Sequence, residues 1–171
     1  GIWNDDFIPG LARIPEALHR HGAKAALQLH HAGRETFEAA AGAMPEAPSS
    51  LPSVILGQPC EAMSPDRIGQ IIESFAKAAG RARQAARAGF DFLEIHGAHG
   101  YLLNQFLSPF SNHREDQYGG SDENRMRFIL EIITAVRRVV GKDFPVWIRV
   151  SADELIRGGY DLAFMQSFAP R

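Results

Sequence analysis

The sequence predicts an α/β fold in which short buried strands alternate with helices. Three short, mostly apolar segments at 23–29, 90–95 and 145–150 have the composition of strands that are buried on both faces of a parallel sheet. Between them lie segments whose apolar residues recur at helical spacing. This alternation favours parallel strands that are joined by right-handed crossovers.

Two helices have clear start and stop signals. Ser64 is a good N-cap with Pro65 at the first helical position, and Gly89 is expected to end that helix. Ser121 is expected to cap the other helix, which Gly141 closes. The apolar stripes that should be buried are Ile68, Ile71, Ile72, Phe75, Ala79 and Ala82 in the first helix, and Phe128, Ile132, Val136 and Val139 in the second.

A weaker helix is expected at 5–19, with Pro15 inside it as a source of a kink. Its apolar face would carry Ile8, Leu11, Ile14 and Leu18. The segment 35–60 is rich in Ala, Pro, Gly and Ser and has no sustained period, so we interpret it as an excursion over the mouth of the sheet.

Composition and charge set the broad class. The chain has 171 residues and a net charge of −2, which gives no reason to expect nucleic acid or an anionic membrane as a partner. Cys60 is the only cysteine, so no intramolecular disulfide is possible and a reducing, cytoplasmic location is expected. No apolar run is long enough to span a bilayer. The absence of an initial methionine hints at a longer reading frame.

The residues with the most chemical information follow the second predicted strand. His96 and His99 lie just past its carboxyl end, where ligands bind in parallel α/β proteins, and glycines beside them permit a tight turn. Two imidazoles at this spacing can converge on one acceptor atom, and Tyr101 offers a phenolic proton nearby. Alternatives stay open at this point: structural histidines, or a metal site that includes Glu94 or Asp91.

Longer motifs surround these residues. The run HGAHGYLLNQFLSP begins at His96 and is followed by N-x-R-x-D-x-YGGS-x-ENR-x-RF, while QLHHAGR occupies 28–34. Together they resemble the flavin oxidoreductases of the Old Yellow Enzyme family. The resemblance covers nearly the whole chain and fades at 163–171, where the expected helix of the family is not evident.

The resemblance implies a partial TIM (β/α)8 barrel, residues 1–171 forming one domain that is incomplete at both ends and contributes barrel strands three to five. It implies FMN as cofactor, NAD(P)H as reductant, and reduction of activated C=C bonds in α,β-unsaturated carbonyl-type substrates. His96 and His99 would hydrogen-bond the substrate carbonyl, and Tyr101 would donate a proton to the α-carbon. Gln28 and Arg149 would contact the flavin.

Two other functions remain as alternatives. One is a non-catalytic half-barrel remnant without FMN binding, and the other, less favoured, is a metal-dependent barrel hydrolase. The isolated chain is expected to bind FMN weakly, because the strands that supply the phosphate site in the family are missing. The expected partner is a small-molecule substrate, and unpaired sheet edges make a homo-oligomer possible.

The remaining motif residues are expected to build structure. Arg114 and Asp116 should pair or cap backbone groups in a polar loop, and Cys60 is interpreted as a loop residue rather than a nucleophile. Arg125 and Arg127 should anchor the same loop or pair with Asp122 or Glu131.

Overall fold

The computed structural model describes residues 1–86 and 90–171. The chain forms two compact units, each built from three separate segments. The first unit consists of Gly1–Leu29, Gly69–Ile95 and Ile132–Ile148, and the second consists of His30–Ile68, His96–Glu131 and Arg149–Arg171.

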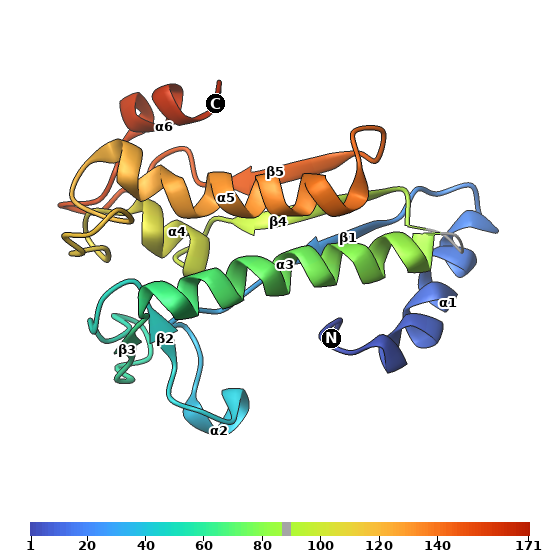
Figure 1. The fold of residues 1–171 in the computed structure, drawn as a ribbon, viewed down its shortest axis with the longest axis horizontal. Coiled ribbons are helices and arrows are strands. Elements are labelled where there is room, and N and C mark those ends of the chain that lie inside the picture. Colours follow the sequence, from blue (N-terminus) through green and yellow to red (C-terminus); the bar gives the residue numbers. More distant parts are fainter. Residues whose placement is uncertain (87–89) are drawn as a thin grey trace. The chain divides into compact units, whose positions relative to one another are not determined.

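A three-stranded sheet contains all three predicted strands, in the predicted order. Its strands are β1 (Ala26–Leu29), β4 (Phe92–Gly97) and β5 (Val146–Val150), with β4 in the centre. β1 and β4 are parallel, with Gln28 opposite Glu94, and the arrowheads of all three strands point the same way in Figure 1. The strands begin one to three residues later than predicted.

Helices and short strands complete the fold (Figure 1). In chain order they are η1 (Asp5–Phe7), α1 (Ile8–His19), α2 (Glu38–Ala41), β2 (Glu46–Ala47), β3 (Glu61–Ala62), α3 (Pro65–Ala86), α4 (Leu102–Leu107), α5 (Asp122–Val140) and α6 (Leu162–Phe168). Among the residues that the structure describes, no helix is both long enough and apolar enough to cross a bilayer.

The predicted helix caps at Ser64 and Ser121 are confirmed. Ser64 Oγ accepts a hydrogen bond from the backbone N–H of Arg67 at 3.1 Å, and Ser121 Oγ accepts one from Asn124 at 3.3 Å. Each bond satisfies a donor that the first helical turn leaves without an intrahelical partner. The predicted end of α3 at Gly89 lies outside the described residues.

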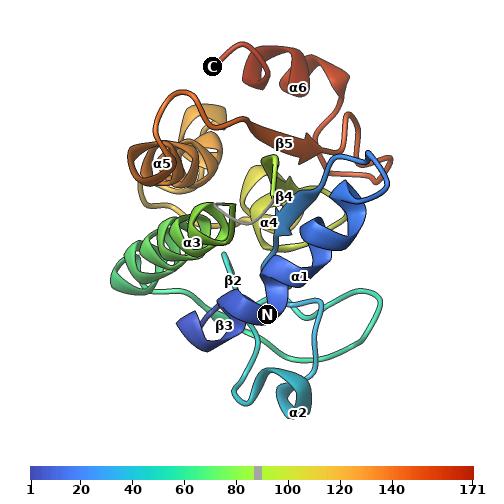
Figure 2. The same ribbon diagram turned by 90° about the vertical axis from the view of Figure 1, so that its right-hand side faces the viewer.

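The buried faces of α3 and α5 follow the predicted periodicity with two corrections, of which the first is that Ile72 in α3 is only partly buried. In α5, Phe128, Ile132 and Val136 are fully buried, but Val139 is 40% exposed and Val140 takes its place in the core. At 3.6 residues per turn, Val140 lies nearer than Val139 to the line through Ile132 and Val136. The parts of α3 and α5 that belong to the first unit lie on the same face of the sheet (Figures 1 and 2).

Only half of the predicted apolar face of α1 is buried. Ile8 and Leu11 pack against the buried pair Ala25 and Phe90. In contrast, Ile14 is 53% exposed and Leu18 is 40% exposed. Pro15 does lie inside the helix, and the kink stays a prediction.

Two segments have more regular structure than the sequence suggested. The segment 35–60 contains α2 and β2, and β2 pairs in parallel with β3. At the carboxyl end, α6 forms where the family helix was not evident: Asp161 Oδ1 accepts from the backbone N–H of Phe164 at 3.0 Å. One apolar side of this short helix is buried, through Phe164, Met165 and Phe168.

Candidate active site

Each strand of the sheet carries one predicted site residue near its carboxyl end. Gln28 in β1, His96 in β4 and Arg149 in β5 are the next-to-last residues of their strands. The carboxyl ends of parallel strands are where ligands bind in such folds. Their positions therefore agree with the strand-end positions expected from the sequence.

The turn after β4 brings the two predicted histidines and the tyrosine together. His99 has φ 60° and Gly100 has φ 75°, so two consecutive residues adopt the left-handed conformation and the chain reverses. The ring centroids of His96 and His99 are 5.1 Å apart, and those of His96 and Tyr101 are 5.4 Å apart. The turn thus gathers three polar side chains at the carboxyl end of β4.

His30 joins this cluster of rings, although no motif indicated a definite role for it. Its ring meets the ring of Tyr101 edge-on, with 4.3 Å between centroids, and lies 5.3 Å from that of His96. Desolvation by partial burial lowers the pKa of His30, which favours the neutral imidazole at pH 7. The only sequence signal was its position directly after the first strand.

His31, the next residue, is held in the loop that follows β1. Its Nδ1 accepts a hydrogen bond from the backbone N–H of Gly33 at 3.0 Å, and its carbonyl oxygen accepts one from Leu102 at 3.1 Å. Burial is the main cause that lowers the pKa of His31 to about 4, so this side chain is neutral in the folded protein at pH 7.

His31 should make the fold sensitive to acid. Its pKa is about 6.5 in the unfolded chain and about 4 in the folded one, so the unfolded state binds more protons between these values. We expect this group to contribute stability that is fully present above pH 6.5 and is lost as the pH falls towards 4. The charge of Glu46 raises the pKa of His31, while those of Arg67 and His30 lower it.

Urea unfolding of the wild type and of His31→Gln at pH 7.5 and 4.5 measures this effect. The wild type should lose about 2 kcal/mol more unfolding free energy than the variant over this range. His113→Gln, at an exposed histidine, is the matched control and should follow the wild type. Equal losses in the wild type and His31→Gln would show that His31 is not the group responsible.

A buried glutamine ties the loop after β1 to the turn after β4. Gln105 is 1% exposed. Its amide nitrogen donates to the carbonyl oxygens of Gly100 at 2.6 Å and Ala32 at 3.4 Å, and its amide oxygen accepts from the backbone N–H of Arg34 at 3.3 Å. A Cβ atom on Gly33, which has φ 61°, would lie 2.3 Å from that amide oxygen. Only glycine therefore fits at this point.

The two carboxylates considered for a metal site have other partners. Asp91 pairs with Lys24 at 2.7 Å and His19 at 2.8 Å, and the hydrogen bond from Lys24 is the first of several that hold its pKa well below the usual range. Glu94 accepts a hydrogen bond from the Gln28 side chain. Within residues 1–86 and 90–171, no group of three or more metal-ligating side chains is present.

Arg149 is suited to an anionic partner. Its side chain is exposed, and among the described residues it forms no ion pair. Reduced flavins carry negative charge, and a guanidinium is always charged and offers several donors. The donor chemistry at this strand end therefore fits a flavin.

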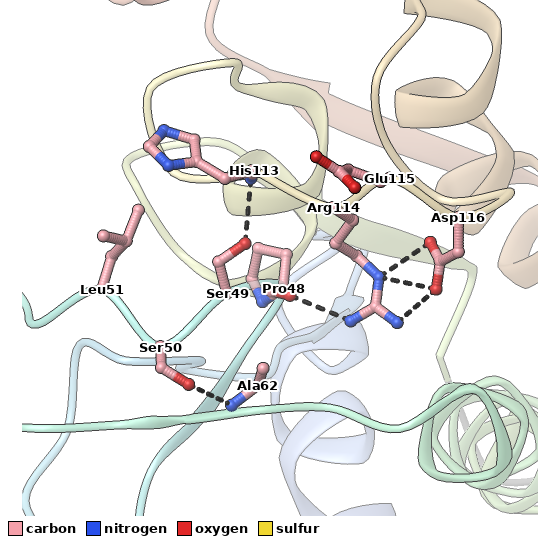
Figure 3. Close-up of a pocket in the computed structure, with 9 residues that line it drawn as sticks. All are labelled: Pro48, Ser49, Ser50, Leu51, Ala62, His113, Arg114, Glu115 and Asp116. Atoms are coloured by element: carbon pink, nitrogen blue, oxygen red, sulfur yellow. Dashed lines mark hydrogen bonds and ion pairs between the residues drawn. The ribbon is translucent and has the colours of Figure 1, made fainter.

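The polar loop after α4 has the structural role that its sequence indicated. Arg114 pairs with Asp116 at 2.5 Å and donates to the carbonyl oxygen of Pro48 at 2.9 Å (Figure 3). It also donates to the carbonyl oxygen of Met63 at 2.7 Å. The hydrogen bond from Arg114 is also the main cause that lowers the pKa of Asp116. These contacts join the loop after α4 to the backbone at Pro48 and Met63, within the second unit.

The neighbouring arginines follow the same pattern. Arg125 pairs with Asp122 and also donates to the carbonyl oxygen of Gly120 at 2.9 Å. Arg127 donates to the Gln117 carbonyl at 2.8 Å rather than pairing with Glu131. Glu131 accepts instead from the Tyr118 hydroxyl.

The pocket shown in Figure 3 is separate from the ring cluster. It has a volume of about 450 Å³ and is lined by 48–51, Ala62 and 113–116. Its arginine is already engaged by Asp116 and two carbonyls, so the charge is not available to a ligand. Nearby, burial raises the pKa of the Cys60 thiol, which donates to the Leu51 carbonyl at 3.0 Å, as expected for a loop residue.

The parallel strand order and the strand-end polar residues define part of a (β/α)8 barrel of the flavin oxidoreductase type. The family model for the NADH:flavin oxidoreductase / NADH oxidase family matches residues 1–169, and the chain belongs to this family. The match continues through α6, so the resemblance does not fade at 163 as the sequence suggested. FMN and NAD(P)H are the cofactor and reductant of the family.

Relatives with known names agree with this assignment. The chain is 47% identical to an NADPH dehydrogenase of Bacillus pumilus (strain SAFR-032), over 95% of this chain and 46% of that protein. It is 46% identical to an NADH oxidase of Thermoanaerobacter brockii, over 93% of this chain and 24% of that protein. The structure of the old yellow enzyme homologue from Zymomonas mobilis matches with a TM-score of 0.85 and 33% identity, over 99% of this chain and 49% of that one. The chain thus spans between a quarter and a half of these relatives.

Proposed function

We propose that this chain forms the substrate-binding part of an NAD(P)H-dependent flavin enzyme that reduces activated C=C bonds in α,β-unsaturated carbonyl-type substrates. One observation carries the proposal: the turn after β4 gathers the rings of His96, His99 and Tyr101. When bound, FMN supplies the hydride that it has taken from NAD(P)H. The rings gathered at the turn supply hydrogen-bond donors for the substrate carbonyl oxygen and a proton for its α-carbon.

The two imidazoles act on the substrate carbonyl. Each neutral imidazole has one N–H, and His96 and His99 each direct that donor at the carbonyl oxygen. Negative charge develops on this oxygen when hydride arrives at the β-carbon. A fixed donor at such an oxygen typically lowers the barrier by about 3 kcal/mol. The histidines therefore bind the substrate and polarise it.

Tyr101 protonates the α-carbon. Its hydroxyl belongs to a ring that is held between His30 and His96, so the proton donor has a fixed position beside the carbonyl-binding pair. Positioned proton donors of this kind contribute about 10²–10⁴-fold to a rate.

Gln28 and Arg149 hold the flavin in this proposal. Gln28 would contact the pyrimidine edge of a bound flavin through its amide, and Arg149 would supply a positive charge that favours the reduced, anionic state. We further propose that residues 1–171 contribute three consecutive strand–helix units to one FMN-binding barrel domain. The share of the relatives that this chain covers supports that extent.

Anaerobic stopped-flow absorbance of the flavin-loaded protein tests this function. NADH or NADPH should bleach the flavin, and a simple cyclic enone should restore its absorbance without oxygen. Reoxidation by oxygen but by no enone, nitroalkene or dienoyl thioester would replace this proposal with an NADH oxidase. Failure to bind FMN in a complete barrel would favour the non-catalytic remnant.

A further inference from the structure

The turn that carries His99 has a conformation that its own residues do not favour. A histidine with φ 60° lies in a sparsely populated region of backbone conformation, which persists only when its surroundings hold it. The His99 side chain is exposed, so burial of its ring does not supply that support. The support must come from bonds to the backbone.

Two side chains from different segments hold the backbone of this turn. The N–H of His99 donates to Ser151 Oγ at 3.1 Å, and the N–H of Gly100 donates to Asn104 Oδ1 at 3.0 Å. Both donors of the left-handed pair are therefore satisfied by side chains. Asn104 is 2% exposed, so water competes little for its oxygen.

The two acceptors are held in turn by a closed set of bonds. The Asn104 amide nitrogen donates to Glu154 Oε1 at 3.0 Å, and Glu154 Oε2 accepts from the backbone N–H of Tyr160 at 3.0 Å. The Tyr160 hydroxyl donates to the Ser151 carbonyl at 3.1 Å. Burial raises the pKa of Tyr160, so this donor keeps its proton. The ring closes where the Ser151 hydroxyl approaches Asn104 Oδ1 at 3.5 Å.

We propose that Ser151, Asn104 and Glu154 are positioning residues that hold the His99–Gly100 turn in its strained conformation and thereby set where the His99 imidazole meets the substrate carbonyl. The proposal rests on the proposed function for the role of His99. None of the three touches the reacting atoms. Their effect passes through the backbone of the turn.

The short distance between the two imidazoles makes the position of His99 important for function as well as for the fold. The His99 ring is only 5.1 Å from the His96 ring, and both must reach one oxygen. An error of about 1 Å in the placement of a reacting group can cost about 10²-fold in rate. If the turn relaxes to a common conformation, the His99 ring leaves that position while the rest of the unit keeps its core.

Ser151→Ala removes the acceptor of the His99 N–H without adding bulk. We expect the His99 amide to exchange its hydrogen at least tenfold faster, while the Ser108 amide, which donates to the Asn104 carbonyl inside the same unit, keeps its rate. Affinity for an enone or phenolic ligand should fall about tenfold, as expected if the displaced His99 imidazole no longer donates its hydrogen bond to the ligand. Reduction of the flavin by NAD(P)H should be unchanged, and Ser151→Thr should restore both properties.

Ser49→Ala is the matched control. Ser49 Oγ also accepts from the backbone N–H of a histidine, His113, at 2.9 Å, but in the loop of the separate pocket (Figure 3). This variant should leave ligand affinity at the wild-type value. The proposal is overturned if the His99 amide of Ser151→Ala exchanges no faster, or if it exchanges faster while ligand affinity equals that of Ser49→Ala. A wild type that binds no enone would instead refute the proposed function, and the exchange rates would still test the network.

Discussion

Replacing both His96 and His99 with alanine should slow reoxidation of the reduced flavin by an enone by about 10³-fold or more. Each proposed donor to the developing oxyanion is worth about 10²–10³ in rate, and the pair acts on one oxygen. Reduction of the flavin by NAD(P)H should suffer much less, because hydride donation from a nicotinamide needs no such pair. Stopped-flow measurement of the two half-reactions separates these effects.

His113→Ala is a suitable control for the double variant. His113 is an exposed histidine of the same unit, and it lies outside the ring cluster. It should leave both half-reactions unchanged. If the double variant kept its affinity for enone and phenolic ligands, the similarity to flavin ene-reductases would extend to the fold only.

The second large effect is expected for Tyr101→Phe. This change removes the proposed proton donor and keeps the ring, so the edge-on contact with His30 at 4.3 Å remains. Alkene reduction should slow by about 10²–10⁴-fold, whereas ligand binding and flavin reduction by NAD(P)H should change little. The oxidative half-reaction with an enone measures this directly.

Tyr118→Phe gives the matched comparison. The Tyr118 hydroxyl donates to Glu131 at 3.0 Å and belongs to the scaffold, so its loss should lower stability by about 1 kcal/mol and leave the oxidative half-reaction intact. An unchanged rate in Tyr101→Phe would mean that the proton comes from another source, most simply solvent. The role assigned to Tyr101 would then be lost.

The strands could be predicted from their apolar composition, but their first residues and their burial could not. The prediction of burial on both faces fits β4 best and was wrong for β5, which has no buried residue, and for β1, in which only Leu29 is buried. The segment 23–25 contains no turn signal that separates it from β1, yet the N–H of Ala25 donates to the Asp91 side chain rather than entering the ladder as a strand residue. Val139 shows the same limit in a helix, since a one-residue shift of the stripe exchanges it with Val140. Apolar composition indicates a strand here, whereas contacts with the rest of the chain determine where the strand begins and how far it is buried.

The candidate site likewise has residues that the sequence predicts and a contact that it does not predict. His96, His99 and Tyr101 were predicted because they are adjacent in sequence and their chemistry is recognisable. The role of Ser151 as an acceptor for His99 was not predictable, because the two residues are 52 positions apart and a serine in a loop has no pattern of its own. Hydrogen bonds between residues that are far apart in sequence depend on the fold, and no local sequence pattern predicts them.

The bonds of Gln105 have a consequence for engineering of the protein. One buried amide serves the loop that contains Ala32 and Arg34 and also the turn that contains Gly100, and Gly33 has no room for a side chain beside it. A replacement loop that has a side chain at position 33, or that moves the Ala32 carbonyl or the Arg34 N–H, would lose these bonds. Attempts to broaden the substrate range should therefore transplant both loops together with the glutamine, as a single cassette, rather than exchange either loop alone.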